Sequence, residues 1–164
     1  MSQRLNPMTA APEAIQPLFA AGKYLTEGTL EPVLRTLVYL RVSQINACAF
    51  CIAMHNRELE HLGESGDRVW GLPAWREAPW YSPRERAALA YAETLTRLAE
   101  EDVGDELFAE LRAQFSEREI VDLTLAISII NTWNRFSVSF RTPPESAAAV
   151  LASLRQPAMA GAGH

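Results

Sequence analysis

Apolar residues recur every three to four positions along much of this chain, the spacing of one face of an α-helix. The clearest run predicts a helix over residues 30–45, on the positions Leu30, Val33, Leu34, Leu37, Val38 and Ile45. Asn46 is of a residue type that favours helix N-caps. We therefore expect it to begin a second helix that holds both cysteines and extends to Leu62. Gly63, a common residue type just past a helix end, would stop that helix.

Two sequence motifs mark the starts of later helices. Ser82-Pro83-Arg84-Glu85 and Ser116-Glu117-Arg118-Glu119 each fit a capping box, in which a serine and a glutamate satisfy the first backbone N–H groups of a helix. They predict helices over residues 82–99 and 120–140, with a shorter helix over 105–115 between them. Pro143 and Pro144 would end the last helix. The Trp- and Pro-rich residues 69–81 are expected to form one short helix and a connection.

The fold class follows from these patterns. No segment alternates polar and apolar residues with a period of two, and no Asn-Gly or Asp-Gly hairpin turn occurs. We predict an all-α fold, an orthogonal bundle of about six or seven helices. It should form a single domain over residues 1–155, followed by a disordered tail at 156–164, where small residues dominate.

The composition is that of an ordinary globular protein, with 48% hydrophobic and 21% charged residues in a chain of 164. The net charge of −5 leaves no basic footprint for nucleic acid and argues against docking on anionic lipid. Prolines at 7, 12 and 17 interrupt the N-terminal segment, so we read no secretory signal there. The most apolar stretch, 121–133, is too short to span a bilayer. We expect a cytoplasmic protein that binds neither nucleic acid nor membrane.

Cys48, Cys51 and His55 form the candidate reactive centre. Their spacing of i, i+3 and i+7 puts them within about 60° of one another on one helical face. Two thiols one turn apart can form a disulfide with little backbone movement, and the histidine follows one turn later. A helix start and a neighbouring imidazole both favour the thiolate, which is the nucleophilic form. We therefore predict that the pKa of Cys51 lies below that of a free thiol.

Two other interpretations of this cluster stay open. The cysteines could be small core residues, or the three side chains could bind zinc. His61, the nearest further ligand, lies on another helical face, and three ligands leave a structural zinc site incomplete. A single close pair in a chain with only two cysteines is typical of a cytosolic redox or metal site. We expect redox chemistry, with no metal and no other cofactor.

Around these residues the chain reads SQINACAFCIAMH from Ser43 to His55. This motif resembles the carboxymuconolactone decarboxylase and alkylhydroperoxidase D superfamily, and it is most similar to the alkylhydroperoxidase D core. The specific part is Cys-x-x-Cys-x-x-x-His. The likeness continues through the segments 74–77, 85–89 and 130–135, and it covers most of the chain, from Pro12 to Pro144.

The resemblance implies an all-α subunit that assembles into homo-oligomers, commonly trimers or hexamers. It also implies reduction of a hydroperoxide substrate through the cysteine pair. Cys51 would then be the peroxidatic thiol, Cys48 the resolving thiol, and His55 a member of the proton relay. A dithiol reductant, a protein or a lipoyl-type group, would restore the pair. The decarboxylase branch lacks this pair, so the cysteines favour the peroxidase branch.

The chain departs from the family pattern at one position. The family has a glutamate twelve residues before the first cysteine, as the base of the relay, and here that residue is Thr36. A threonine hydroxyl can hold a water but is no base at neutral pH. Glu93 and Glu31 are candidate substitutes, and Gln44 could orient a water. Glu93 is equally compatible with an ion-paired carboxylate.

Two further functions therefore stay open beside a thiol peroxidase. The chain could be a sensing or binding protein whose disulfide only reports oxidation, without turnover. It could also be a non-redox lyase of the decarboxylase type, which would act on a lactone with its thiols blocked.

Overall fold

The computed structural model describes residues 2–155 and contains no strand in that range. Its elements are, in chain order, α1 (Pro7–Ala10), α2 (Pro12–Thr26), α3 (Pro32–Ile45), α4 (Ala49–His61), α5 (Gly66–Trp70), η1 (Leu72–Ala74), α6 (Pro83–Thr96), α7 (Asp105–Gln114), α8 (Glu117–Phe140), η2 (Pro144–Ser146) and α9 (Ala147–Arg155). The all-α fold is confirmed. The expected tail at 156–164 lies outside the described residues. Within the described range, no helix combines the length and the apolar character needed to cross a membrane.

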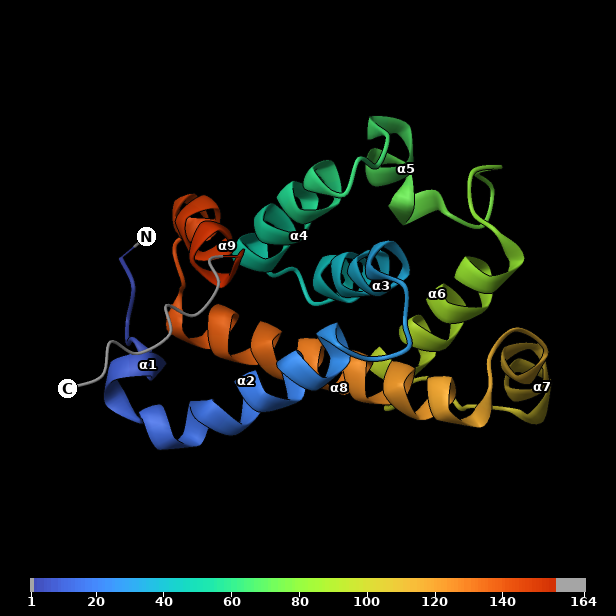
Figure 1. Cartoon of the computed structure of the whole chain (residues 1–164), viewed down its shortest axis with the longest axis horizontal. Helices are drawn as coiled ribbons and strands as arrows, with labels where there is room; N and C mark the ends of the chain where they lie inside the picture. Colours follow the sequence, from blue (N-terminus) through green and yellow to red (C-terminus); the bar gives the residue numbers. More distant parts are fainter. Residues whose placement is uncertain (1, 156–164) are drawn as a thin grey trace.

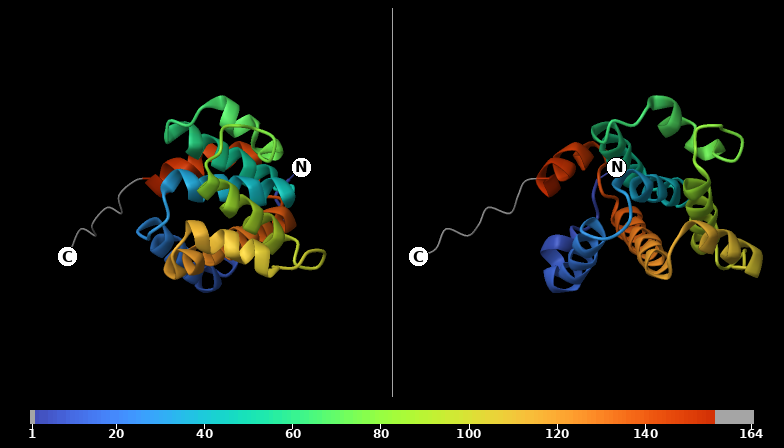
Figure 2. Two further views of the ribbon diagram at one scale, coloured as in Figure 1. Left: turned by 90° about the vertical axis from the view of Figure 1, so that its right-hand side faces the viewer. Right: turned by 45° about the vertical axis from the view of Figure 1, so that its right-hand side comes forward.

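Helix α3 is the centre of the bundle. It packs against α4, α6 and α8, which surround it in Figure 1. The figure shows α3 running partly along the line of sight while α8 lies across the picture, so the two helices cross steeply. Helix α2 packs along α8, α7 packs against α6, and α9 lies beside α4, as the further views in Figure 2 also show.

Apolar side chains fill the space on two sides of α3. Leu34, Val38 and Val42 belong to a core that also takes residues from α6, α7 and α8. Leu37 and Leu40 face a second core, which continues into α4, η1 and α6 through Leu59, Leu72 and Leu89. Each fully buried aliphatic side chain stabilises the fold by about 1.5–3 kcal/mol relative to exposure. Helix α3 is thus held from both sides, and its C-terminal end leads into the short link that ends at Cys48.

Both predicted capping boxes are confirmed. The hydroxyls of Ser82 and Ser116 accept from the backbone N–H groups of Glu85 and Glu119, and each glutamate side chain accepts from its serine N–H. Helix α6 ends at Thr96, three residues before the expected end. Gly63, with φ +81°, follows the end of α4 as expected, because glycine tolerates this backbone region without a Cβ clash.

The number of helices differs from the expectation of about six or seven, since residues 2–155 form nine α-helices. Those not predicted are α1, α2 and α9. The short helix expected within residues 69–81 lies mostly before that range, as α5, and η1 is a 3-10 turn inside the range. Helix α2 continues through Pro17, a residue that removes one backbone hydrogen bond and usually breaks a helix. Pro17 and Glu13, whose carbonyl loses its intrahelical donor, are both exposed, so water can hydrate that carbonyl. The missing bond is therefore tolerated at this surface helix.

Candidate active site

The link between α3 and α4 is held by a partly buried amide cluster. Asn46 ends α3 as its C-cap, and its side-chain amide donates to the Oδ1 atoms of Asn131 and Asn134 on α8, at 2.9 Å each. Asn134 in turn donates to the Ser43 hydroxyl at 3.0 Å. Ala47 follows with a left-handed φ of +52°. The expectation that Asn46 caps the second helix was wrong, because α8 engages its side chain.

Cys48 takes the capping position instead. Its sulfur accepts from the Cys51 backbone N–H at 3.3 Å, and α4 begins at the next residue. The two cysteines form a disulfide with a Cα–Cα distance of 5.4 Å, and both residues are only 1% exposed. Both sulfurs therefore lie at the positive end of α4, where the free backbone N–H groups favour negative charge.

His55 is the third member of the predicted centre and lies one turn after Cys51 on α4. The residue is buried, and its ring packs against Tyr39 of α3 with 5.3 Å between ring centroids. Its Nδ1 atom is 3.0 Å from Oε2 of Glu58. Its Nε2 atom is buried and has no hydrogen-bond partner among the described residues. The predicted residues thus share one helix, with a carboxylate directly behind the imidazole.

Glu58 was not predicted from the sequence, although it stands three residues after His55 on the same helix. Burial alone would raise its pKa, but hydrogen bonding from His55, the charges of His55 and Arg35, and the Thr36 hydroxyl outweigh burial and lower it. Tyr39, beside the same group, has its pKa raised to about 12 by burial, which outweighs the opposing charge of Arg35. Glu58 is therefore ionised and Tyr39 is neutral at neutral pH.

The Thr36 hydroxyl has two acceptors near it, the Pro32 carbonyl oxygen and the Glu58 carboxylate. The side chain is fully buried, and its hydroxyl donates to the Pro32 carbonyl oxygen at 2.8 Å, one turn earlier in α3. It lies close enough to Glu58 to favour the ionised carboxylate. The position of the family's relay glutamate is thus occupied by a small side chain that adjoins a carboxylate from another helix.

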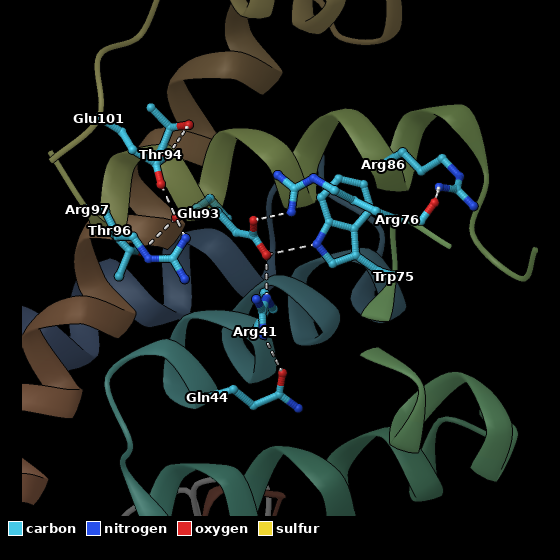
Figure 3. Close-up of polar contacts among 11 residues, drawn as sticks. Arg41, Gln44, Trp75, Arg76, Arg86, Glu93, Thr94, Thr96, Arg97 and Glu101 are labelled. Carbon is cyan, nitrogen blue, oxygen red and sulfur yellow. Dashed lines mark hydrogen bonds and ion pairs between the residues drawn. The ribbon is translucent and has the colours of Figure 1, made fainter. Parts of the chain in front are cut away.

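Glu93 and Gln44 take part in a different cluster, which joins α3 to α6 (Figure 3). Oε1 of Glu93 accepts from Arg41 Nε at 2.6 Å and from Trp75 Nε1 at 2.9 Å. Its Oε2 accepts from Arg76 at 2.5 Å, and Gln44 accepts from Arg41 at 3.3 Å. Burial would raise the pKa of Glu93, but these donors outweigh it and lower the pKa.

The donors around Glu93 leave it as an ion-paired carboxylate, one of the two interpretations of this residue. Glu31, the other candidate substitute, pairs with Arg84 at the surface, with distances of 3.0 and 3.2 Å. Among the described residues, no group of three or more histidine, cysteine or acidic side chains is placed to hold a metal ion.

Comparison with known sequences gives one family and two relatives. The sequence profile of the Carboxymuconolactone decarboxylase family matches residues 10–94. The chain is 40% identical over 139 residues to YdfG of Bacillus subtilis (strain 168), which covers 85% of this chain and 95% of YdfG. It is 32% identical over 116 residues to YnjA of Escherichia coli (strain K12), which covers 71% of this chain and 63% of YnjA. Both relatives are described as uncharacterized proteins.

Among solved structures, the chain resembles ATU0492 of Agrobacterium tumefaciens, with a TM-score of 0.84 and 42% sequence identity. The match covers 87% of this chain and 97% of that one, so the two share one fold. ATU0492 is a protein of unknown function that has been proposed to be the antioxidant defence protein AhpD.

Proposed function

Because the chain belongs to the carboxymuconolactone decarboxylase family and has a cysteine pair one turn before a buried histidine, we propose that it is a thiol-dependent peroxidase. Its substrate would be a hydroperoxide, reduced through Cys48 and Cys51. The observation that carries the proposal is the disulfide at the start of α4 together with the His55 Nε2 atom, which has no partner among the described residues. The proposed antioxidant role of ATU0492 supports the same activity.

The reaction has three steps. The Cys51 thiolate attacks the hydroperoxide, an S–O bond forms, the O–O bond breaks, and the leaving oxygen takes a proton to become an alcohol. The Cys48 thiol then attacks the Cys51 sulfenic acid, and water leaves as the disulfide forms. A dithiol, a protein or a lipoyl-type group, finally supplies two electrons and two protons and becomes a disulfide itself.

The helix start supports these roles. The Cys51 N–H donates to the Cys48 sulfur, so a thiolate on Cys48 has a backbone donor in place. When a dithiol attacks the Cys51 sulfur, Cys48 is the leaving group, and stabilising it as a thiolate speeds that step. A cytoplasmic location suits this cycle, since cytosolic dithiols keep such pairs reduced.

We also propose that the chain forms a homo-oligomer, as its resemblance to the alkylhydroperoxidase D core implies. Large apolar side chains lie exposed on several helices, among them Phe19, Trp70, Val121 and Val138. These side chains would give a second subunit apolar surface to cover.

The proposal is tested by one round of peroxide reduction in the absence of a reductant. Pre-reduced protein is mixed with cumene hydroperoxide, and sulfenic acid is trapped with dimedone and detected by mass. Cys48→Ser should consume about one peroxide per chain and accumulate the adduct. Cys51→Ser should consume none. Ala49→Ser, an exposed neighbour on the same turn, is the matched control and should behave as the wild type.

Other results would contradict the proposal. A burst that survives only in Cys51→Ser would transfer the peroxidatic role to Cys48. Slow stoichiometric oxidation, with no turnover under excess dithiothreitol, would indicate a redox sensor. Lactone conversion that persists with both thiols alkylated would indicate a lyase.

A further inference from the structure

The contact between His55 and Glu58 determines which imidazole nitrogen is basic. A carboxylate can only accept hydrogen bonds, so the 3.0 Å contact with Glu58 places the hydrogen of His55 on Nδ1. In the neutral imidazole, Nε2 then carries the lone pair. This is the buried atom that lacks a partner among the described residues. The contact with Glu58 at Nδ1 therefore leaves Nε2, on the opposite side of the imidazole ring, as the proton acceptor.

The surroundings of Glu58 keep it ionised, so that it can accept a hydrogen bond from His55 Nδ1. The titratable and charged groups that face it are His55 on its own helix and Arg35 and Tyr39 on α3. Arg35 and His55 favour the carboxylate, and Tyr39 is neutral because burial raises its pKa to about 12. Glu58 also remains partly exposed, so its ionisation needs no complete removal from water.

We propose that Glu58 is a positioning residue of this site, which fixes the Nδ1–H tautomer of His55 and stabilises the imidazolium formed when Nε2 takes the Cys51 proton. The inference rests on the proposed peroxidase function and assigns the relay's carboxylate to α4. The proton moves from the Cys51 sulfur to Nε2, and the imidazolium then returns it to the alkoxide that leaves the hydroperoxide. No net charge is gained, because the thiolate and imidazolium form together and are consumed together.

The structure also explains why Thr36 is compatible with this arrangement. Thr36 is buried beside Glu58, on the helix that packs against α4. A carboxylate at position 36 would face the Glu58 carboxylate, and two like charges at close range cannot both stay ionised. A small hydroxyl leaves the single negative charge with Glu58.

The test compares Glu58→Gln with Glu60→Gln, an identical change at an exposed position of the same helix. A glutamine amide can donate to Nδ1, which allows the opposite tautomer, and it carries no charge to balance the imidazolium. We expect Glu58→Gln to slow the single-round peroxide reduction about 10- to 100-fold at pH 7, the loss typical when the hydrogen-bond partner behind a metal-bound histidine is removed. Glu60→Gln should be unchanged. Glu58→Asp should recover part of the rate, because it retains the charge.

Two readouts separate positioning from general damage. In the reduced protein, the pH midpoint for Cys51 alkylation by iodoacetamide should rise in Glu58→Gln toward the free value of about 8.5. The 15N chemical shifts of His55 should show Nδ1–H in the wild type and a mixture of tautomers in the variant. Neither readout needs peroxide, so both can succeed even if the protein proves not to be a peroxidase. Unchanged tautomer, midpoint and rate in a folded Glu58→Gln would overturn the inference.

Discussion

Replacing Glu93 by glutamine removes one negative charge from the contact between α3 and α6 and keeps the shape of the side chain. The amide oxygen can still accept from Arg41 and Trp75, but its NH2 group then faces the Arg76 donor. Arg41 and Glu93 have side chains only 13% and 3% exposed, so their 2.6 Å ion pair is largely screened from water. Breaking a buried pair of this kind costs about 3–5 kcal/mol.

The contact with Arg76 adds little to that figure. The Arg76 side chain is 61% exposed, and exposed pairs contribute about 0–1 kcal/mol. Since the amide oxygen of the glutamine still accepts part of these hydrogen bonds, we expect a loss at the lower end of the range of about 3–5 kcal/mol. The free energy of unfolding should fall by about 3 kcal/mol. For a chain of this length, that lowers Tm by about 6–12 °C. Calorimetry and urea unfolding measure it directly.

Glu27→Gln is the matched control, because Glu27 pairs with Lys23 at 3.8 Å between side chains that are both largely exposed. It should change stability by no more than about 0.5 kcal/mol. A Glu93→Gln variant as stable as this control would refute the reasoning. At temperatures where it is folded, Glu93→Gln should retain the peroxide burst, since the partners of Glu93 are Arg41 on α3 and Trp75 and Arg76 in the connection between η1 and α6, all outside the cysteine centre.

The effect should depend on pH in a defined direction. Although burial opposes it, the donors around Glu93 lower its pKa in the folded protein. The folded state then binds the proton less tightly than the unfolded state, whose glutamate pKa is about 4.3. The stabilisation is complete above that value and is lost as the pH falls through the lower folded pKa. The difference between wild type and Glu93→Gln should therefore shrink below about pH 4.

Two further predictions concern the link and the surface. Ala47 lies exposed with φ +52°, where a side chain with a Cβ destabilises the fold by about 1–2 kcal/mol. Ala47→Gly removes this strain. It also raises the conformational entropy of the unfolded chain, which lowers the stability of the fold by about 0.4–1 kcal/mol. Urea unfolding should show Ala47→Gly unchanged or up to about 1.5 kcal/mol more stable, and a clear loss would mean that the Cβ makes a contact worth keeping. Light scattering of the wild type should give at least twice the chain mass, in a whole-number multiple, and a monomer at micromolar concentration would contradict the homo-oligomer.

The sequence predicts the helices whose ends depend on neighbouring residues. Ser82 and Ser116 each form hydrogen bonds with a residue three positions later, so their capping boxes can be recognised from the sequence without knowledge of the fold. Asn46 has the same kind of local preference, yet its amide bonds to Asn131 and Asn134, 85 and 88 positions away. Those bonds exist only once α3 and α8 have packed. A tertiary contact thus overrides the capping preference of Asn46, and Cys48 becomes the N-cap of α4.

The candidate site divides in the same way. The shared face of Cys48, Cys51 and His55 follows from helical spacing alone. Glu58 could have been found by the same rule, because a residue three positions after a histidine lies beside it on a helix. What spacing could not supply is the effect of Arg35 on its charge, since α3 and α4 meet only in the folded protein. Glu93 likewise shows its partners only when Arg41, 52 positions away, reaches it.

Helix α3 takes part in the contacts that join it to each of its three neighbours in the bundle. Ser43 bonds to α8 through Asn134, Arg41 bonds to α6 through Glu93, and Tyr39 packs on His55 of α4. Apolar contacts have little directional preference, whereas a buried hydrogen bond is satisfied at one register and is costly to lose at others. Hydrogen bonds thus fix α3 against α6 and α8, and the Tyr39 ring packs it against α4. Since Cys48 follows the end of α3 by three residues, fixing that helix also fixes the position of the redox pair.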